Sequence, residues 1–198
     1  MRPAIALLTL TFLFDQPYFT SQEVRELGVP TAILNYYVKA GYIKRVRRGV
    51  YQKSDYENPF AFRWEDLVEA VYSIKGGVVC LISALAIYDL TEEIPRQHWI
   101  AIRHGTSIKE FPKVRLLRYR NMELGRVEIQ LEGMRIPIFD RERTIIDAFR
   151  LLSRETAIKA LKMALGKGGK ERLDLVRLQE YARQLRFNIA PYLMSLTT

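Results

Sequence analysis

The sequence has few of the residues that build disulfide frameworks and metal sites. It has one cysteine, Cys80, and two histidines, His98 and His104. A single cysteine excludes an internal disulfide framework and a zinc site made of thiolates, and such sparing use suits a reducing cytosol. Cys80 lies in the apolar run GGVVCLISALAIY, where a thiol stays protonated and unreactive. We therefore expect a cytoplasmic protein that needs no cofactor and no metal.

The chain also lacks the short motifs of common enzymes. No metal-binding histidine pair at helical spacing and no G-x-S-x-G nucleophile turn is present. The glycine-rich GKGGK at 166–170 lacks the spacing and the Ser or Thr of a phosphate-binding loop, so we predict a flexible loop there. Asp89, Glu128 and Gln130 resemble an acidic nuclease centre, but the lysine expected two positions after the strand acid is absent. We predict no enzyme and keep a metal-dependent nuclease on the middle sheet as an alternative.

No apolar run is long enough to span a membrane. The run AIALLTLTFLF is only 11 residues long, where about 20 are needed. Arg2 precedes it as in a signal peptide, but DQPYFTSQEV follows without a small-residue cleavage site. We therefore expect no membrane partner and a buried first helix over about Arg2 to Phe14. Its buried face would carry Ile5, Leu8 and Phe12.

What the chain does have is an excess of positive charge. Its 31 Lys and Arg residues against 22 Asp and Glu give a formal charge of +9. The excess lies at both ends, since residues 1–53 and 146–198 each carry +5 and residues 54–145 carry −1. A basic surface attracts polyanions, and phosphate contacts dominate the affinity of proteins for nucleic acids. The charge therefore favours a nucleic-acid partner.

Two further short helices are predicted before residue 42. The sequence Thr20-Ser-Gln-Glu23 has the spacing of a capping box, which begins a helix, and Gly28 is suited to end it. A third helix starts at Pro30, because proline is favoured at a first helical position, and it stops at Gly41. The intervening ELGVPTA supplies the short turn of a helix-turn-helix.

After this point the periodicity changes from helical to strand-like. The stretch GYIKRVRRGVYQK reads as two strands, at 42–46 and 50–53, joined by Arg47-Arg48-Gly49. Three helices followed by a basic hairpin have the order of a winged helix-turn-helix. We therefore predict a DNA-binding domain over residues 1–54.

The third helix would carry the base-reading face of this domain. Leu34, Tyr37 and Val38 form its inward stripe, so the opposite side is free to enter the major groove of double-stranded DNA. Asn reads adenine, Thr and Lys bind phosphate or base edges, and a basic hairpin tip contacts phosphates or the minor groove. The predicted DNA-binding residues are Thr31, Asn35, Tyr36, Lys39, Lys44, Arg45, Arg47 and Arg48.

A second domain is expected after a linker at 55–62. Residues 63–198 predict an α+β fold with a small sheet flanked by helices. Helices are expected at 62–76, 80–91, 141–152, 154–165 and 174–186, and strands at 98–103, 114–119, 127–133 and 134–140. Asp140 is the expected cap of the helix RERTIIDAFRLL. Within that helix, Asp147 stands at the spacing for an ion pair with Arg143 or Arg150.

Three stretches together resemble the AbiEi-type antitoxins of abortive-infection type IV toxin–antitoxin pairs. GYIKRVRRGVYQ is similar to the family's G-x-[LI]-x-R-V-x-R-G-x-Y wing. CLISALAIYDLTEEIPRQHWIAIRHG resembles its Ser-Ala-Leu helix with the strand that follows, and IPIFDRERTIIDAFR its x-D-x-E-R-T-[LI]-x-D segment. The likeness covers most of residues 20–152.

This resemblance implies a transcriptional regulator with two domains. The winged domain would bind inverted repeats upstream of its own operon and repress it. The C-terminal domain, 63–198, would counter a nucleotidyltransferase-like toxin encoded beside it, with no direct contact required. An alternative is a DNA-binding accessory subunit of a repair or restriction system.

Overall fold

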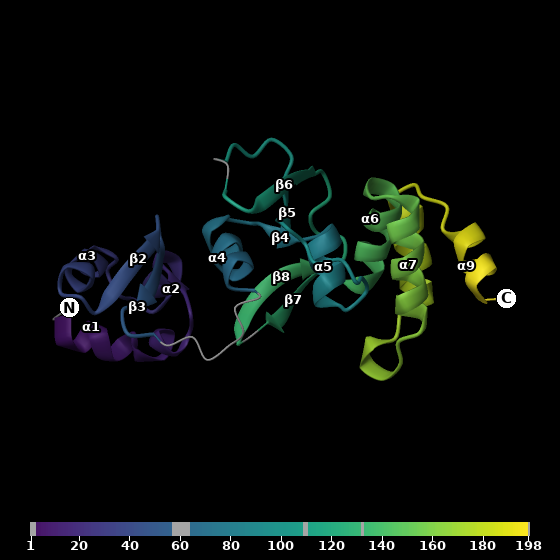
Figure 1. Cartoon of the computed structure of the whole chain (residues 1–198). Coiled ribbons are helices and arrows are strands. Elements are labelled where there is room, and N and C mark those ends of the chain that lie inside the picture. Colours follow the sequence, from purple (N-terminus) through teal and green to yellow (C-terminus); the bar gives the residue numbers. More distant parts are fainter. Residues whose placement is uncertain (1–2, 57–63, 109–110, 132, 198) are drawn as a thin grey trace. The chain divides into compact units, whose positions relative to one another are not determined.

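The computed structural model describes residues 3–56, 64–108, 111–131 and 133–197 (Figure 1). By its internal contacts the chain divides into two compact units, residues 1–75 with 130–135, and residues 76–129 with 136–198. The predicted α+β class is confirmed, with a small sheet near the N-terminus and a larger sheet with helices after it. Most of the predicted linker, 55–62, lies outside the described residues. None of the described helices is long and apolar enough to cross a membrane.

The N-terminal unit contains the elements of a winged helix-turn-helix. In chain order these are α1 (Pro3–Thr9), the 3-10 helix η1 (Thr11–Asp15), β1 (Phe19–Thr20), α2 (Ser21–Glu26), α3 (Ala32–Lys39), β2 (Ile43–Arg47) and β3 (Val50–Lys53). β3 lies between β1 and β2 and is antiparallel to both. The sequence did not predict β1, because two residues are too few to show strand alternation.

The first helix buries a different face from the one predicted. Ile5, Leu8 and Phe12 are 54%, 76% and 52% exposed, so the predicted buried stripe is wrong. The buried side chains are instead those of Ala6, Leu10 and Leu13. The run is apolar on every side, so its periodicity cannot identify the inward face. The predicted single helix also ends early, because the backbone tightens into η1 from residue 11.

The core of the winged domain forms where this first segment meets the sheet and α3. Phe19 stacks on Tyr51 across the β1–β3 pair, with ring centroids 5.8 Å apart. Leu34 and Tyr37 of α3 are 1% exposed and pack into the same cluster as Phe19. These contacts fix one side of α3 against the domain and leave the other side to solvent.

A fourth helix, α4 (Glu65–Ser73), belongs to the same compact unit. The helix expected at 62–76 is present here, and its apolar side chains are buried: Trp64, Leu67, Val68 and Val71.

The second sheet has five strands in the order β6-β5-β4-β8-β7. Its elements are β4 (Val78–Val79), α5 (Leu81–Ile87), β5 (His98–Arg103), β6 (Val114–Tyr119), β7 (Arg126–Leu131) and β8 (Met134–Phe139). β5 is parallel to β6 and antiparallel to β4, while β4 is parallel to β8. β4 was not predicted, and its two residues sit in a continuous apolar run that shows no alternation. α5 ends at Ile87 and not near Thr91 as predicted.

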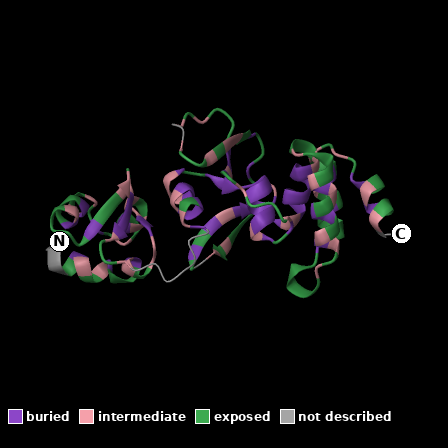
Figure 2. Ribbon diagram, in the orientation of Figure 1, coloured by how far each residue is buried: buried purple, intermediate pink, exposed green. Residues whose placement is uncertain are grey.

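Helices complete the second unit. They are α6 (Arg141–Leu151), α7 (Arg154–Leu165), the short 3-10 helix η2 (Gly169–Glu171), α8 (Leu175–Gln184) and α9 (Ala190–Thr197). Buried residues run along α5 and through residues 142–148 of α6, and they line one side of α7 (Figure 2). α9 was not predicted; it is positioned by Tyr192, whose ring centroid lies 4.5 Å from that of Phe149 on α6.

The predicted ion pair of Asp147 is confirmed with both partners. Arg143 Nε and Arg150 Nη1 each donate to a different Asp147 oxygen at 2.7 Å. Arg143 is 2% exposed and Asp147 is 1% exposed. The two remaining Arg143 nitrogens donate to the carbonyls of Leu124, at 2.9 Å, and Asn121, at 3.3 Å. This network joins α6 to the turn before β7, so these charges are structural.

Candidate nucleic-acid interface

The turn between α2 and α3 is built as the sequence predicts. Thr20 Oγ1 accepts from the backbone amide of Glu23 at 3.2 Å, and the Glu23 carboxylate accepts from the Thr20 amide at 2.6 Å. This reciprocal capping box begins α2. Gly28 ends it at a φ of 72°, a left-handed conformation that favours glycine. α3 starts at Ala32, two residues after Pro30 where the sequence placed it.

The predicted recognition face of α3 is open to solvent. Asn35 and Lys39 are exposed, and Tyr36 is 52% exposed beside them. Thr31, at the N-terminal end of the helix, is partly exposed and makes no capping bond with its side chain. The predicted inward stripe is confirmed, because Leu34 and Tyr37 are buried and Val38 is partly buried against the same core. From Thr31 at its N-terminal end to Lys39 at its last residue, the exposed side of α3 therefore presents a hydroxyl, an amide, a phenol and an ammonium group.

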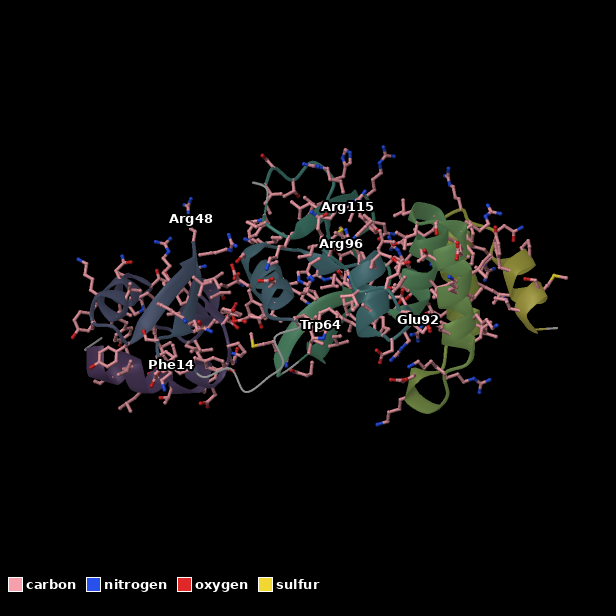
Figure 3. The ribbon with its side chains drawn as sticks, viewed as in Figure 1. Phe14, Arg48, Trp64, Glu92, Arg96 and Arg115 are labelled. Atoms are coloured by element: carbon pink, nitrogen blue, oxygen red, sulfur yellow. The ribbon has the colours of Figure 1, made fainter. Side chains whose placement is uncertain are left out.

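The wing is the β2–β3 hairpin. Gly49 has a φ of 79° at the turn, and its carbonyl accepts from the Ser21 amide at 2.9 Å, which ties the hairpin to the start of α2. Lys44, Arg45 and Arg48 are exposed. Arg48 projects from the end of the hairpin, away from the domain (Figure 3). The β2–β3 register shifts between positions 45 and 47, and such a bulge bends a strand and re-aims its side chains.

Arg47 differs from the other wing cations in a way the sequence did not predict. Its Nε donates to a carboxylate oxygen of Glu69 on α4, forming an ion pair. Close by in the same unit, the Tyr18 hydroxyl donates to Glu65 at 3.3 Å. Burial raises the pKa of Tyr18, and the carboxylates of Glu65 and Glu69 raise it further, so the phenol keeps its proton. α4 therefore faces the wing with an acidic edge.

Nothing in the sequence predicted the contact between Arg47 and Glu69. Glu69 stands 22 residues after Arg47. Periodicity finds ion pairs only at helical spacing, and residues 57–63 between them lie outside the described part of the chain. The clue in the sequence is the acidic face of α4 itself, which carries Glu65, Asp66 and Glu69.

The other features that the sequence marked offer no catalytic arrangement. Among the described residues, no three His, Cys, Asp or Glu side chains come together as a metal site. Of the nuclease-like set, Glu128 and Gln130 are exposed on β7, and Asp89 follows α5. Cys80 is buried, and burial raises the pKa of its thiol. GKGGK is a loop entering η2, where Lys167 pairs with Glu171 at 3.3 Å.

The fold and this surface define the N-terminal unit as a winged helix-turn-helix, the class of domain that reads DNA with its third helix. Residues 9–52 match the family model described as "Transcriptional regulator, AbiEi antitoxin". The resemblance to AbiEi-type antitoxins, a family of transcriptional regulators, is thereby confirmed over residues 9–52, which hold the helix-turn-helix and its wing. A comparison with curated proteins gives no match.

A solved structure extends the likeness in fold. The RV2827C protein from Mycobacterium tuberculosis has a crystal structure that matches with a TM-score of 0.50 at 11% sequence identity. The match covers 90% of this chain and 71% of that chain. At this identity the match shows a shared fold and nothing about function.

Proposed function

We propose that this chain binds double-stranded DNA through α3 and the wing and represses transcription of its own operon. The observation that carries the proposal is the exposed polar face of α3 beside the cationic hairpin. Asn35 and Lys39 lie on the side of α3 opposite the buried Leu34, and Arg48 stands at the hairpin tip. A recognition helix in the major groove and a basic wing on the backbone need this arrangement.

The family match supports a finer proposal. We propose that the protein is the antitoxin of a type IV pair, acts in the cytoplasm, and opposes a nucleotidyltransferase-like toxin encoded beside it. Direct contact with that toxin is not required, and the protein is not itself an enzyme. The inverted repeats upstream of the operon are the proposed operator.

The test of DNA binding is a footprint of the purified protein on its own upstream DNA. The expected result is protection of paired half-sites that are inverted repeats, with affinity for scrambled DNA lower by at least about 10³-fold. Equal protection of scrambled DNA would overturn sequence-specific repression.

A second experiment separates the antitoxin from a repair or restriction subunit. Co-expression of the protein with the neighbouring reading frame should restore growth that this frame alone arrests. Failure to restore growth, with operator binding intact, would leave a regulator and remove the antitoxin assignment.

A further inference from the structure

The first helical segment exposes a row of large apolar side chains. Ile5, Leu8 and Phe12 are 54%, 76% and 52% exposed, and they follow one another at intervals of three and four residues, which places them on one side. We call these three side chains the α1 stripe. The opposite side is covered, since Ala6 and Leu10 are fully buried. Single exposed apolar residues are ordinary, but a contiguous group of them marks a surface that another molecule covers.

The α1 stripe offers a ligand little besides apolar contact. Residues 3–14 contain no Lys, Arg, His, Asp or Glu. The hydroxyls beside the stripe are bonded to the backbone: Thr9 Oγ1 donates to the Ile5 carbonyl at 3.1 Å. Thr11 Oγ1 likewise donates to the Leu8 carbonyl. DNA is bound by cations and hydrogen-bond donors, and a helix that lies on a membrane carries Lys or Arg on its polar face, so the stripe suits an apolar protein surface instead.

The charges around the α1 stripe favour a second copy of this chain as its partner. The chain carries a formal charge of +9, so two copies repel each other over most of their surface. The charges that flank residues 3–14 have opposite signs, because Arg2 precedes them in the sequence and Asp15 follows them. Two copies that meet antiparallel therefore bring unlike charges together, whereas parallel copies would bring like charges together. An antiparallel contact of one element with its own copy has twofold symmetry.

The α1 stripe is too small to hold two free copies together firmly. A stable protein–protein interface has about 20–30 residues on each side, and the stripe has three. A contact of this size forms when another ligand raises the effective concentration of the two copies, as adjoining sites on one DNA molecule do, to about millimolar. Inverted half-sites are related by a twofold axis, so the symmetry of the proposed operator matches that of the antiparallel contact.

We propose that two copies of this chain, bound to neighbouring half-sites of the operator, dock their α1 stripes antiparallel against each other. The proposal deepens the proposed function and rests on it for the operator. The contact makes binding of the second copy more favourable than binding of the first. A helix that is apolar on every side is normally covered on every side, and the second copy covers the side that the single chain leaves exposed.

A cysteine placed in the stripe tests the contact directly. Leu8 lies between the other two stripe residues in the sequence, so in Leu8→Cys the two introduced thiols should meet near the twofold axis. A disulfide between them requires Cα atoms within about 7 Å of each other. The native Cys80 is buried, so oxidation acts on position 8 alone.

We expect Leu8→Cys to form a disulfide-linked dimer on DNA with two half-sites, and at least about tenfold less of it on DNA with one. Ile94→Cys is the matched control, because Ile94 is 81% exposed and belongs to the second unit. This control should stay monomeric on both DNAs. Equal cross-linking of the two variants would overturn the contact, as would no cross-link in Leu8→Cys with both half-sites occupied.

Two double variants with the same change of charge measure what the contact contributes. L8E/F12E puts carboxylates into the α1 stripe, and I94E/V176E puts them at exposed apolar positions of the second unit. Wild type and I94E/V176E should bind the second half-site about 5–150-fold more tightly than the first, the usual range for coupled sites. L8E/F12E should bind both half-sites equally, with the same affinity for a single half-site as I94E/V176E. Gel-shift titrations on DNA with one and with two half-sites measure these constants.

Each remaining outcome supports or overturns the contact. Cooperative binding by L8E/F12E would overturn it, as would loss of cooperativity in both double variants, which would assign the effect to charge. A lower thermal unfolding temperature for L8E/F12E alone, with cooperativity kept, would show that the stripe is covered within the single chain. If the wild type has no preference for operator DNA, the proposed function fails, and the Leu8→Cys dimer is then measured in the free protein at increasing concentration. A dimer there would uphold the α1 contact, and its absence would overturn it.

Discussion

Arg143 in the second unit and Arg48 in the winged unit lie in opposite surroundings. In α6, Arg143 is 2% exposed and donates to Asp147 and to two backbone carbonyls. In the wing, Arg48 is exposed and has no partner among the described residues. The same cation therefore stabilises a core in one unit and is available to a ligand in the other. Counting charges along the sequence does not distinguish these roles, but hydrogen-bond partners do.

The local sequence carries part of this difference. Arg143 has Asp147 four residues later in the same helix, where the two side chains meet. No acidic residue lies within four positions of Arg48. The wing cation can therefore be neutralised only by a distant segment or by a ligand.

The largest expected effect concerns the buried arginine, Arg143. Arg143→Ala leaves the Asp147 carboxylate buried with only Arg150 beside it and frees two carbonyls. We expect a loss of about 3–5 kcal/mol in unfolding free energy, measured by urea denaturation. Arg48→Ala, the matched control, should change it by less than about 0.5 kcal/mol. Similar values for the two variants would show that Arg143 is not structural.

A second prediction concerns Asp140, the cap of α6. Its pKa is raised to about 6, mainly because burial disfavours the carboxylate. The folded protein therefore binds the proton more tightly than the unfolded chain, whose Asp has a pKa of about 3.9. Stability should fall as pH rises from about 4 to about 6, by about 3 kcal/mol at most.

Asp140→Asn isolates this effect, because the amide oxygen can still accept from the Arg143 amide, as Asp140 does at 2.8 Å. As pH rises from about 4 to about 6, the unfolding free energy of the wild type should fall relative to that of the variant. A difference that is constant from pH 4 to 7 would contradict the raised pKa.

A third prediction concerns Asn35, on the exposed face of α3. Asn35→Ala should cost about 1–3 kcal/mol on the operator and little on random DNA, because alanine cannot make the bidentate hydrogen bonds to adenine. Gel-shift titrations on both DNAs measure this, with the exposed Gln179 on α8, changed to alanine, as control. Equal losses on both DNAs would make Asn35 a phosphate contact or a structural residue.

Much of the fold could be predicted because its signals are local. The capping box at Thr20, the turn glycine at 49 and the strands at 98–103 and 114–119 agree with the structure. Each depends on residues within one element, so spacing and residue type determine it. The exposed face of α3 followed for the same reason, from the buried stripe on its other side.

What could not be predicted depends on contacts between distant segments. Two-residue strands such as β1 and β4 exist only because a neighbouring strand pairs with them. Because α1 is apolar on every side, its residue pattern did not identify the buried face, and the wrong face was assigned to the core. The Arg47–Glu69 pair likewise depends on which strand and helix become neighbours. The sequence therefore did not show that Glu69 competes for Arg47. The assignment of the α3 and wing residues to DNA binding stays a prediction.

The wing gives the next prediction. Arg47→Ala with Arg48→Ala should flatten the log–log salt slope of DNA binding by about 1–2 units, since each arginine bound to a phosphate contributes about 0.9. Taken singly, Arg48→Ala should account for the larger share, because Arg47 already pairs with Glu69. An unchanged slope in the double variant would remove the wing from the DNA interface. A larger share for Arg47 would show that Glu69 releases it fully on DNA.

The smallest expected effect concerns the ion pair between Arg47 of the wing and Glu69. Glu69→Gln keeps the shape of the side chain and removes the charge that competes with phosphate for Arg47. A partly exposed ion pair contributes about 0.2–1 kcal/mol, so DNA should bind up to about fivefold more tightly, on cognate and random sequences alike. In a double-mutant cycle with Arg47→Ala this gain in affinity should vanish, because Glu69 then has no Arg47 for which to compete with phosphate. A gain that persists without Arg47 would mean that Glu69 repels DNA directly. A loss of affinity in Glu69→Gln would mean that the ion pair positions Arg47 to bind DNA. In that case a paired arginine of the wing would bind DNA as the unpaired Arg48 is expected to do, and pairing would not separate structural arginines from DNA-binding ones.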